Sequence, residues 1–391
     1  MNQPRIDINQ VRADTPGCEN ILHFDNAGAS LPPNPVFDTV LKHLQLEREL
    51  GGYRAAAEAT DRLESFYTGF SRLLNCDPGE IAYVENATRG WDMAFYAIPF
   101  NAGDRILTSR AEYASNYLAF LQHARRRQLI IDVIPDDSSG QLDIEQLEQM
   151  IRQRTRLIAI THVPTQGGLV NPVAAVGRIA RQHGVNYLLD ACQSVGQMPL
   201  DVEAIGCDML SGTGRKYLRG PRGTGFLYVR DSVLESLEPP FIDLHSATWT
   251  DENDFRYQPG ARRFENWESY VSGKLGLAAA VDYALALGLD VIEGRIRELA
   301  DRLRNSLQEI DEITLHDQGP DQCGIVSFTR RGETPQDIHQ RLTAAGVNTT
   351  VSSASYARLD LAARQLDAVV RASLHYFNTE LEIDRFCELL R

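Results

Sequence analysis

Short apolar runs alternate with amphipathic stretches through the middle of this 391-residue chain. Runs rich in β-branched and aromatic residues predict seven strands, at residues 81–85, 105–108, 129–134, 156–160, 186–189, 208–211 and 225–229. Apolar residues at helical spacing predict helices between several of them, at 115–127, 144–152 and 173–183. This alternation indicates an α/β domain on a mostly parallel or mixed sheet, and the nearly continuous apolar strands favour helices on both of its faces.

The flanking segments follow other patterns. Residues 36–50 and 54–74 predict helices interrupted at Gly51 and Gly52, whereas residues 240–270 are irregular and aromatic, as in loops near a site or an interface. Residues 274–310 predict a long helix or a helix pair, followed by a strand at 324–329 and a last helix from Glu380. We expect a large domain over residues 20–268 and a smaller α+β domain over 269–391, which residues 1–19 join.

Composition and charge exclude several classes of protein. A hydrophobic fraction of 43% and a charged fraction of 24% are those of a soluble globular protein. The net charge of −14 disfavours a nucleic-acid partner. No apolar run approaches the ~20 residues of a membrane helix. The first residues lack a basic stretch followed by an apolar core, so we expect no signal peptide and a cytoplasmic location.

The six cysteines are scattered, with no CxxC pair and no His/Cys spacing suited to a metal, so neither a disulfide framework nor a metal site is expected: Cys18, Cys76, Cys192, Cys207, Cys323 and Cys387.

Residues 185–229 carry the most informative chemistry. One predicted strand ends in Asp190, with Gln193 shortly after it, and the next ends in Thr213-Gly-Arg-Lys216 before a glycine-rich return. A lysine amine, a carboxylate and a group of hydroxyl, cationic and backbone donors are what pyridoxal phosphate needs for its aldehyde, its ring nitrogen and its phosphate. The return, GPRGTG, lacks the GxGxxG spacing and leads into a strand, so it is not a nucleotide loop.

With FDNAGASLPP at residues 24–33 and VVRASLHYFNTELEIDRF at 369–386, this stretch resembles the class V aminotransferase family of fold-type I pyridoxal-phosphate enzymes. That family includes cysteine desulfurases, C–S lyases and isopenicillin N epimerase. The resemblance covers nearly the whole chain. It implies the aspartate aminotransferase-like fold, with a large mixed seven-stranded sheet domain and a smaller α+β C-terminal domain. It also implies pyridoxal 5'-phosphate as cofactor and a homodimer with the site at its interface.

The resemblance assigns roles to individual residues. Lys216 matches the Schiff-base lysine, Asp190 the partner of the pyridine nitrogen and Gln193 the donor to the phenolic oxygen. The remaining cofactor contacts would hold the phosphate, stack on the ring or reach the phenolic oxygen: Ala87, Thr88, Thr213 and Arg215; Tyr113; and Thr165.

For the substrate, Arg371 matches the arginine that binds the α-carboxylate in a bidentate pair, and Asn26 and Arg54 lie in stretches that line the family's substrate pocket. Taken singly, Arg371 could be a salt-bridge residue and Tyr113 a packing aromatic.

Three departures from the family pattern bear on the activity. Thr165 stands where an asparagine is usual, and Trp267 and Glu268 stand where the partner's phosphate-binding Gly-Thr pair is usual. The loop that carries the sulfur-accepting cysteine of desulfurases reads GVNTTVSSASYARLDLAARQLDAVV over residues 346–370 and has no cysteine, with Tyr356 near that position. Cys192 flanks Asp190, and we expect its side chain to point away from that carboxylate.

We therefore expect no persulfide-forming desulfurase. Lys216 as general base and Asp190 as ring partner would begin elimination, racemisation and transamination in the same way. The resemblance favours β-elimination, because desulfurase-like members that lack the loop cysteine include C–S lyases. We expect a C–S β-lyase that cleaves a cysteine-derived amino acid (an S-conjugate or a sulfoxide) to pyruvate, ammonia and a sulfur product. The Ser/Thr-rich residues 349–355 are either a site for a polar leaving group or a solvated turn. The alternatives are an epimerase of the isopenicillin N type, with Tyr113 or His162 as second acid/base, or an aminotransferase. Retention of the whole constellation argues against a binding protein without catalysis.

Overall fold

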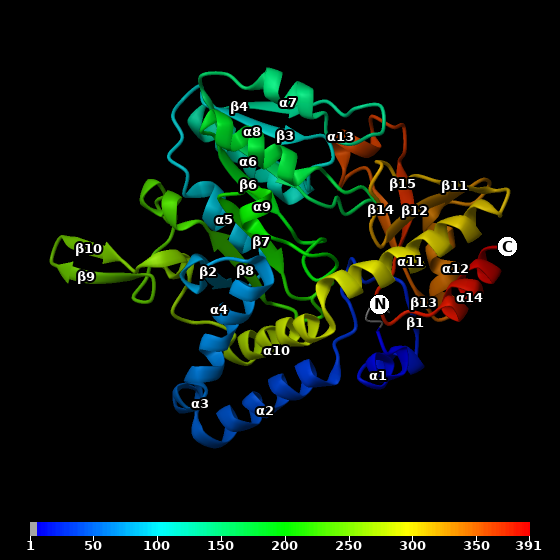
Figure 1. The fold of residues 1–391 in the computed structure, drawn as a ribbon, viewed down its shortest axis with the longest axis horizontal. Coiled ribbons are helices and arrows are strands. Elements are labelled where there is room, and N and C mark those ends of the chain that lie inside the picture. The colour runs from blue at the N-terminus through cyan, green and yellow to red at the C-terminus, as the bar shows by residue number, and fades with distance from the viewer. Residues whose placement is uncertain (1–5) are drawn as a thin grey trace, which may run out of the picture.

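A seven-stranded sheet forms the centre of the larger part of the molecule (Figure 1). In the computed structural model, which describes residues 6–391, its order is β2-β8-β7-β6-β5-β3-β4. Neighbours from β7 to β4 pair in parallel, whereas β8 pairs antiparallel with β7 and β2. The mixed seven-stranded sheet that the sequence predicted is confirmed, with strands β2 (Ile81–Val84), β3 (Arg105–Ser109), β4 (Ile130–Ile134), β5 (Thr155–Thr161), β6 (Asn186–Asp190), β7 (Met209–Thr213) and β8 (Gly225–Val229).

Helices cover both faces of this sheet because successive strand residues point to opposite sides. Leu188 packs with the helices α5 (Ala87–Tyr96) and α6 (Ala114–Arg127), whereas Leu189 packs with α8 (Val173–His183), α4 (Thr60–Leu74) and α10 (Val271–Leu287). Both leucines are fully buried. The near-continuous apolar strands thus fill two cores, one on each face. Shorter helices on this part of the chain are α7 (Ile144–Met150) and α9 (Val202–Ile205).

A second, four-stranded sheet with order β11-β12-β15-β14 belongs to the C-terminal part. It is antiparallel and packs on helices in a core of its own, which includes Phe24, Val326 and Phe386. Its elements are α11 (Leu289–Gln308), β11 (Ile313–Leu315), β12 (Ile325–Arg330), α12 (Pro335–Ala344), β13 (Val347–Asn348), β14 (Thr350–Ser353), α13 (Arg358–Leu361), β15 (Ala368–Ser373) and α14 (Glu380–Leu390).

The two parts of the molecule contact each other through residues 22–24 and through helix α10. Strand β1 (Leu22–His23) pairs in parallel with β13, and Phe24 lies in the C-terminal core. Helix α10 packs instead on α2 (Asn34–Leu50) and α4, and the chain bends by 80° between α10 and α11. The boundary predicted between residues 268 and 269 stays a prediction, and residues 1–5 of the predicted small domain lie outside the described residues. The N-terminal helix is α1 (Ile8–Ala13).

Two segments differ from the sequence prediction. The stretch predicted as one helix over 54–74 is two, α3 (Gly52–Glu58) and α4, which meet at Ala59. The segment predicted as irregular over 240–270 contains an antiparallel hairpin, β9 (Ala247–Asp251) and β10 (Asp254–Tyr257). Most of its residues are exposed on both faces, so no alternation of apolar and polar residues marks it in the sequence.

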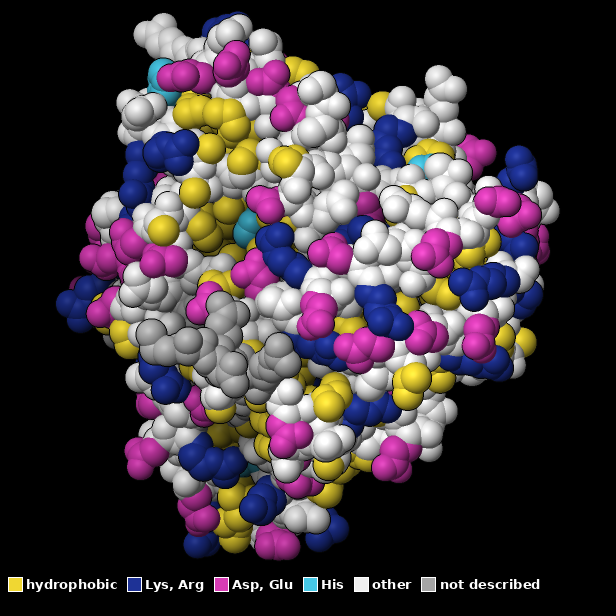
Figure 2. Space-filling model, turned by 45° about the vertical axis from the view of Figure 1, so that its right-hand side comes forward, with side chains coloured by type: hydrophobic (Ala, Val, Ile, Leu, Met, Phe, Trp, Pro, Cys, Tyr) yellow, Lys and Arg dark blue, Asp and Glu magenta, His cyan; other side chains and the backbone are white. Residues whose placement is uncertain are grey.

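The surface mixes acidic and basic side chains, with apolar ones between them on the face drawn in Figure 2. Within residues 6–391, no single helix is long and apolar enough to span a bilayer. Only α10 and α11 taken together reach that length and composition, across their 80° bend.

Candidate active site

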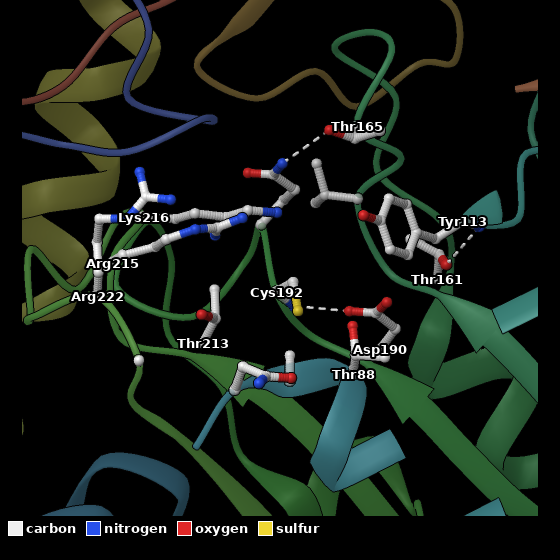
Figure 3. A pocket seen from close by; sticks show the side chains of 15 residues that line it. Thr88, Tyr113, Thr161, Thr165, Asp190, Cys192, Thr213, Arg215, Lys216 and Arg222 are labelled. Atoms are coloured by element: carbon white, nitrogen blue, oxygen red, sulfur yellow. Dashed lines mark hydrogen bonds between the residues drawn. The ribbon is translucent and has the colours of Figure 1, made fainter. Parts of the chain in front are cut away.

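The carboxyl ends of three neighbouring strands meet beside the start of helix α5. Thr161 ends β5, Asp190 ends β6 and Thr213 ends β7, and Lys216 follows three residues later. In open α/β sheets, ligands bind at this edge. Here the side chains enclose a cavity of about 410 Å³ (Figure 3), lined by Asn86, Ala87, Thr88, Tyr113, Thr161, Val163, Thr165, Asp190, Cys192, Gln193, Thr213, Arg215, Lys216, Arg222 and Gly223.

One end of the cavity is built to hold an anion. Helix α5 begins there, with Asn86 as its N-cap and Thr88 in its first turn. A Cβ on Gly225 would lie 2.9 Å from the carbonyl carbon of Asn86, so only glycine lets β8 approach this turn so closely. Arg215 and Arg222 add guanidinium groups from the chain that follows β7. Backbone N–H groups at a helix start, hydroxyls and guanidiniums are the donors that phosphate prefers.

Asp190 and Tyr113 lie together at another side of the cavity (Figure 3). Asp190 is buried; its Oδ1 accepts a hydrogen bond from the Cys192 N–H at 2.9 Å, and its Oδ2 accepts one from Asn116 Nδ2 at 2.9 Å. These two donors hold the carboxylate in one orientation. A carboxylate so placed can pair with a protonated ring nitrogen.

Lys216 reaches the cavity from the side opposite Tyr113 and Asp190 (Figure 3). It is 8% exposed, and burial lowers the pKa of its ammonium group to about 8. Near neutral pH a substantial fraction of this lysine is therefore the neutral amine. That form attacks aldehydes and accepts protons.

Arg371 and Gln193 meet at Thr165. Arg371 Nη1 donates to Thr165 Oγ1 at 2.8 Å and to its carbonyl oxygen at 2.9 Å, and Gln193 Nε2 donates to the same Oγ1 at 3.0 Å. Arg371 Nη2 donates to Asp25 at 2.8 Å. Two buried atoms of this group have no partner among residues 6–391, Arg371 Nε and Gln193 Oε1. An unpartnered buried polar atom costs about 1–3 kcal/mol, a cost that a ligand atom beside it would remove.

Comparison with known proteins agrees with this geometry. The family model "Aminotransferase class-V" matches residues 22–386. The chain belongs to the class-V aminotransferase family. It is 33% identical to a probable cysteine desulfurase of Xylella fastidiosa, over 98% of this chain and 95% of that protein.

Two solved structures share the fold of this family member. An apo cysteine desulfurase of Thermococcus onnurineus superposes with a TM-score of 0.92 at 27% identity, over 100% of this chain and 98% of that one. The cystine C–S lyase C-DES, in complex with its reaction product cysteine persulfide, superposes with a TM-score of 0.87 at 23% identity, over 96% of this chain and 98% of that one. The fold-type I architecture expected from the sequence is confirmed.

The family's cofactor is pyridoxal phosphate, and the residues present fit it. The cavity offers an anion site at the start of α5, a carboxylate at Asp190, an aromatic ring at Tyr113 and a buried amine at Lys216. All the residues that the sequence assigned to the cofactor line this cavity: Ala87, Thr88, Tyr113, Thr165, Asp190, Gln193, Thr213, Arg215 and Lys216. Their individual contacts with it stay predictions.

The residues predicted to bind the substrate lie differently. Arg371 is buried behind Thr165 and does not itself line the cavity. Asn26 is fully buried and bonds to Ser30 and to the Ser373 carbonyl, and Arg54 is exposed on α3 and pairs with Glu58. Neither Asn26 nor Arg54 lines the cavity. Their contact with a substrate stays a prediction, which the geometry of this single chain does not support.

The prediction that Cys192 points away from Asp190 was wrong. Residues two apart in an extended chain point to the same side, and Cys192 is the second residue after Asp190. Its thiol lies beside Asp190 in the cavity, and burial, followed by the Asp190 charge, raises its pKa well above the usual value. Sequence analysis also missed Arg222, which lines the cavity. It could have been found as the arginine of the glycine-rich segment GPRGTG that follows Lys216.

Proposed function

We propose that this chain is a C–S β-lyase that releases pyruvate, ammonia and a sulfur product from an S-conjugate or sulfoxide of cysteine. The observation that carries the proposal is the position of the cysteines relative to the cavity, together with the pKa of the one thiol that lines it. Cys192 alone among them lines the cavity within residues 6–391, and the pKa of its thiol is raised. A sulfur acceptor must be a thiolate, so this thiol is unsuited to that task.

The segment before Arg371 supports the same proposal. Tyr356, near the position of the desulfurase cysteine, is 64% exposed and lies just after β14. Residues 349–355, expected to hold a leaving group or to form a solvated turn, are mostly strand: Thr350–Ser353 pair with β15, and none of these residues lines the cavity. With no protein thiolate to receive sulfur, the sulfur fragment leaves as a free product.

The chain's own residues divide the reaction between them. Bound pyridoxal phosphate supplies an electron sink for the negative charge that develops at the substrate Cα. Asp190 holds a proton at the ring nitrogen, and Lys216 in its neutral form removes the proton from Cα. Arg371 would donate from its Nε to a carboxylate oxygen of the substrate once the side chain moves out from behind Thr165. The sulfur then leaves Cβ with the electron pair of the C–S bond. The remaining 2-aminoacrylate tautomerises to an imine and takes up one water to give pyruvate and ammonia.

An epimerase is the second candidate, favoured by the position of Tyr113 opposite Lys216 (Figure 3). The other candidate for a second acid, His162, does not line the cavity, and burial lowers its pKa to about 4, which keeps it neutral near pH 7. Tyr113 is therefore the residue whose loss would separate epimerisation from elimination.

We further propose a homodimer in the cytoplasm. Of the large apolar side chains exposed within residues 6–391, most lie on α2 and α3 or within residues 241–270: Phe37, Leu41, Leu44 and Tyr53; and Phe241, Ile242, Leu244, Trp249, Phe255, Trp267 and Tyr270. Exposed apolar patches of this kind are typical of subunit interfaces. All six cysteines are free thiols, which fits a reducing compartment.

The deciding experiment is pyruvate release by the cofactor-loaded protein from cysteine, cystine, S-substituted cysteines and their sulfoxides, with Lys216→Ala as the blank. Pyruvate from a sulfur-bearing substrate, absent in the blank, supports the lyase. No pyruvate, together with exchange of the α-proton in heavy water, would overturn it in favour of the epimerase.

A further inference from the structure

A buried carboxyl lies behind the cofactor cavity without lining it. Glu112 occupies the turn between β3 and α6 and is 4% exposed. Its Oε1 accepts hydrogen bonds from Thr161 Oγ1 at 2.5 Å and from Asn116 Nδ2 at 2.8 Å, and its Oε2 accepts one from Thr108 Oγ1 at 3.0 Å. The ion pairs of residues 6–391 include none to Glu112, so neutral donors alone satisfy this group.

Asn116 connects this carboxyl to the pyridine-nitrogen site. Its Nδ2 donates one hydrogen to Glu112 Oε1 at 2.8 Å and the other to Asp190 Oδ2 at 2.9 Å. Both hydrogens of the amide nitrogen are thereby used, and Asn116 is buried. The two carboxyl groups face each other across a single amide, so the position of one fixes the position of the other.

Glu112 also holds the chain that carries the aromatic ring. Its Oε1 accepts a hydrogen bond from the backbone N–H of Tyr113 at 3.0 Å, and Thr161 Oγ1 lies 3.2 Å from the same nitrogen. The Glu112 side chain is thus hydrogen-bonded to Tyr113 directly and to Asp190 through Asn116.

We propose that Glu112, acting through Asn116, is a positioning residue for the cofactor's pyridine ring, which sets the orientation of Asp190 at the ring nitrogen and of Tyr113 at the ring face. Neither Glu112 nor Asn116 lines the cavity. The inference rests on the family's cofactor and not on the identity of the leaving group.

The electrostatics of the site agree with this geometry. Burial raises the pKa of Glu112 to about 7, against the effect of the hydrogen bonds from Thr161 and Asn116. A carboxyl with that pKa holds a proton in much of the population near neutral pH, which limits the repulsion between two buried carboxylates. The negative charge is then concentrated on Asp190, where the protonated ring nitrogen needs it.

The test compares Glu112→Ala and Asn116→Ala with Thr108→Val as the matched control. Thr108 is fully buried and bonds to the same carboxyl, but on the oxygen that does not contact Asn116 or Tyr113. Two quantities are measured on protein loaded with pyridoxal phosphate: the dissociation constant, and the NMR resonance of the isotopically labelled ring nitrogen, which reports its protonation.

We expect Glu112→Ala and Asn116→Ala to weaken cofactor binding about tenfold, as the loss of outer-shell partners does at metal sites, and to move the resonance toward that of the unprotonated nitrogen. Thr108→Val should leave both quantities unchanged. A wild-type resonance and affinity in both alanine variants, with only the melting temperature lowered, would reduce Glu112 to a structural role and overturn the proposal. If Glu112→Ala fails to fold, Asn116→Ala decides. Because neither readout requires turnover, failure of the proposed lyase activity leaves this test intact.

Discussion

The hydroxyl oxygen of Thr165 lies 2.8 Å from Nη1 of Arg371 and accepts its hydrogen bond. The same oxygen accepts a second bond from Gln193 at 3.0 Å. With two bonds accepted, the hydroxyl hydrogen of Thr165 is left to be donated. A threonine therefore stands between the arginine expected to bind the substrate and the glutamine expected at the cofactor, and it orients both.

Replacement of Thr165 should disturb both neighbours at once. Thr165→Val keeps the shape of the side chain but removes the hydroxyl acceptor, so Arg371 Nη1 and Gln193 Nε2 each lose one of two hydrogen bonds and keep those to the carbonyl oxygens of Thr165 and Ala27. One unpaired buried N–H costs about 1–3 kcal/mol. We expect KM for amino-acid substrates to rise about tenfold or more, with a changed visible absorbance of the bound cofactor. Thr165→Ser, which keeps the hydroxyl, is the control. Equal KM values in the valine and serine variants would contradict this role.

Covalent capture of the cofactor should follow the titration of Lys216. Since burial lowers the pKa of this lysine to about 8, the reactive neutral amine predominates above that pH and falls about tenfold for each pH unit below it. The rate at which the apoprotein develops the visible absorbance of bound pyridoxal phosphate should rise accordingly and level off above about pH 8. Lys216→Ala should develop no such band. A rate that stays constant across the neutral range would show that Lys216 titrates elsewhere.

Loss of Cys192 should leave the proposed lyase active. Because its thiol is held neutral beside Asp190, Cys192→Ala should form pyruvate from the best sulfur substrate within about twofold of the wild-type rate. Mass spectrometry of the wild-type protein during turnover should find no persulfide on any cysteine. A persulfide on Cys192, together with an inactive alanine variant, would instead identify a desulfurase with an unusually placed acceptor.

Arg219 should be essential for stability and not for chemistry. This side chain is 1% exposed and donates from Nε to the Leu31 carbonyl at 2.8 Å, from Nη1 to the Tyr376 hydroxyl at 2.7 Å and from Nη2 to Thr15 at 2.5 Å. It thereby ties the N-terminal segment and the chain after β15 to the loop after Lys216.

Arg219→Ala leaves the buried acceptors of Leu31, Tyr376 and Thr15 without their donor and opens a cavity. The free energy of unfolding should therefore fall by about 3–5 kcal/mol. Denaturant unfolding of the apoprotein measures this change. Arg230→Ala, at a less buried arginine that pairs with Glu203, is the comparison, expected to cost about 1 kcal/mol or less. A loss at Arg219 no larger than at Arg230 would contradict its structural role.

The strands, the helices and the place of the cofactor cavity could be predicted from the sequence alone. The seven strands and the helices between them follow from local periodicity, which the sheet's two cores impose on neighbouring residues. The motif around Asp190, Gln193 and Lys216 located the cofactor cavity, since the carboxyl ends of parallel strands meet at one edge whatever the details of the fold.

Only the tertiary structure decided how distant segments meet. The exposed hairpin β9–β10 carries no alternation of apolar and polar residues that would predict it. Thr165 and Arg371 are far apart in the sequence, and so are Asn116 and Asp190, yet each pair shares a hydrogen bond. Such contacts depend on three-dimensional packing between elements, which no local pattern encodes. The residues that line the cofactor cavity were therefore readable from the sequence, whereas those that hold them in place were not.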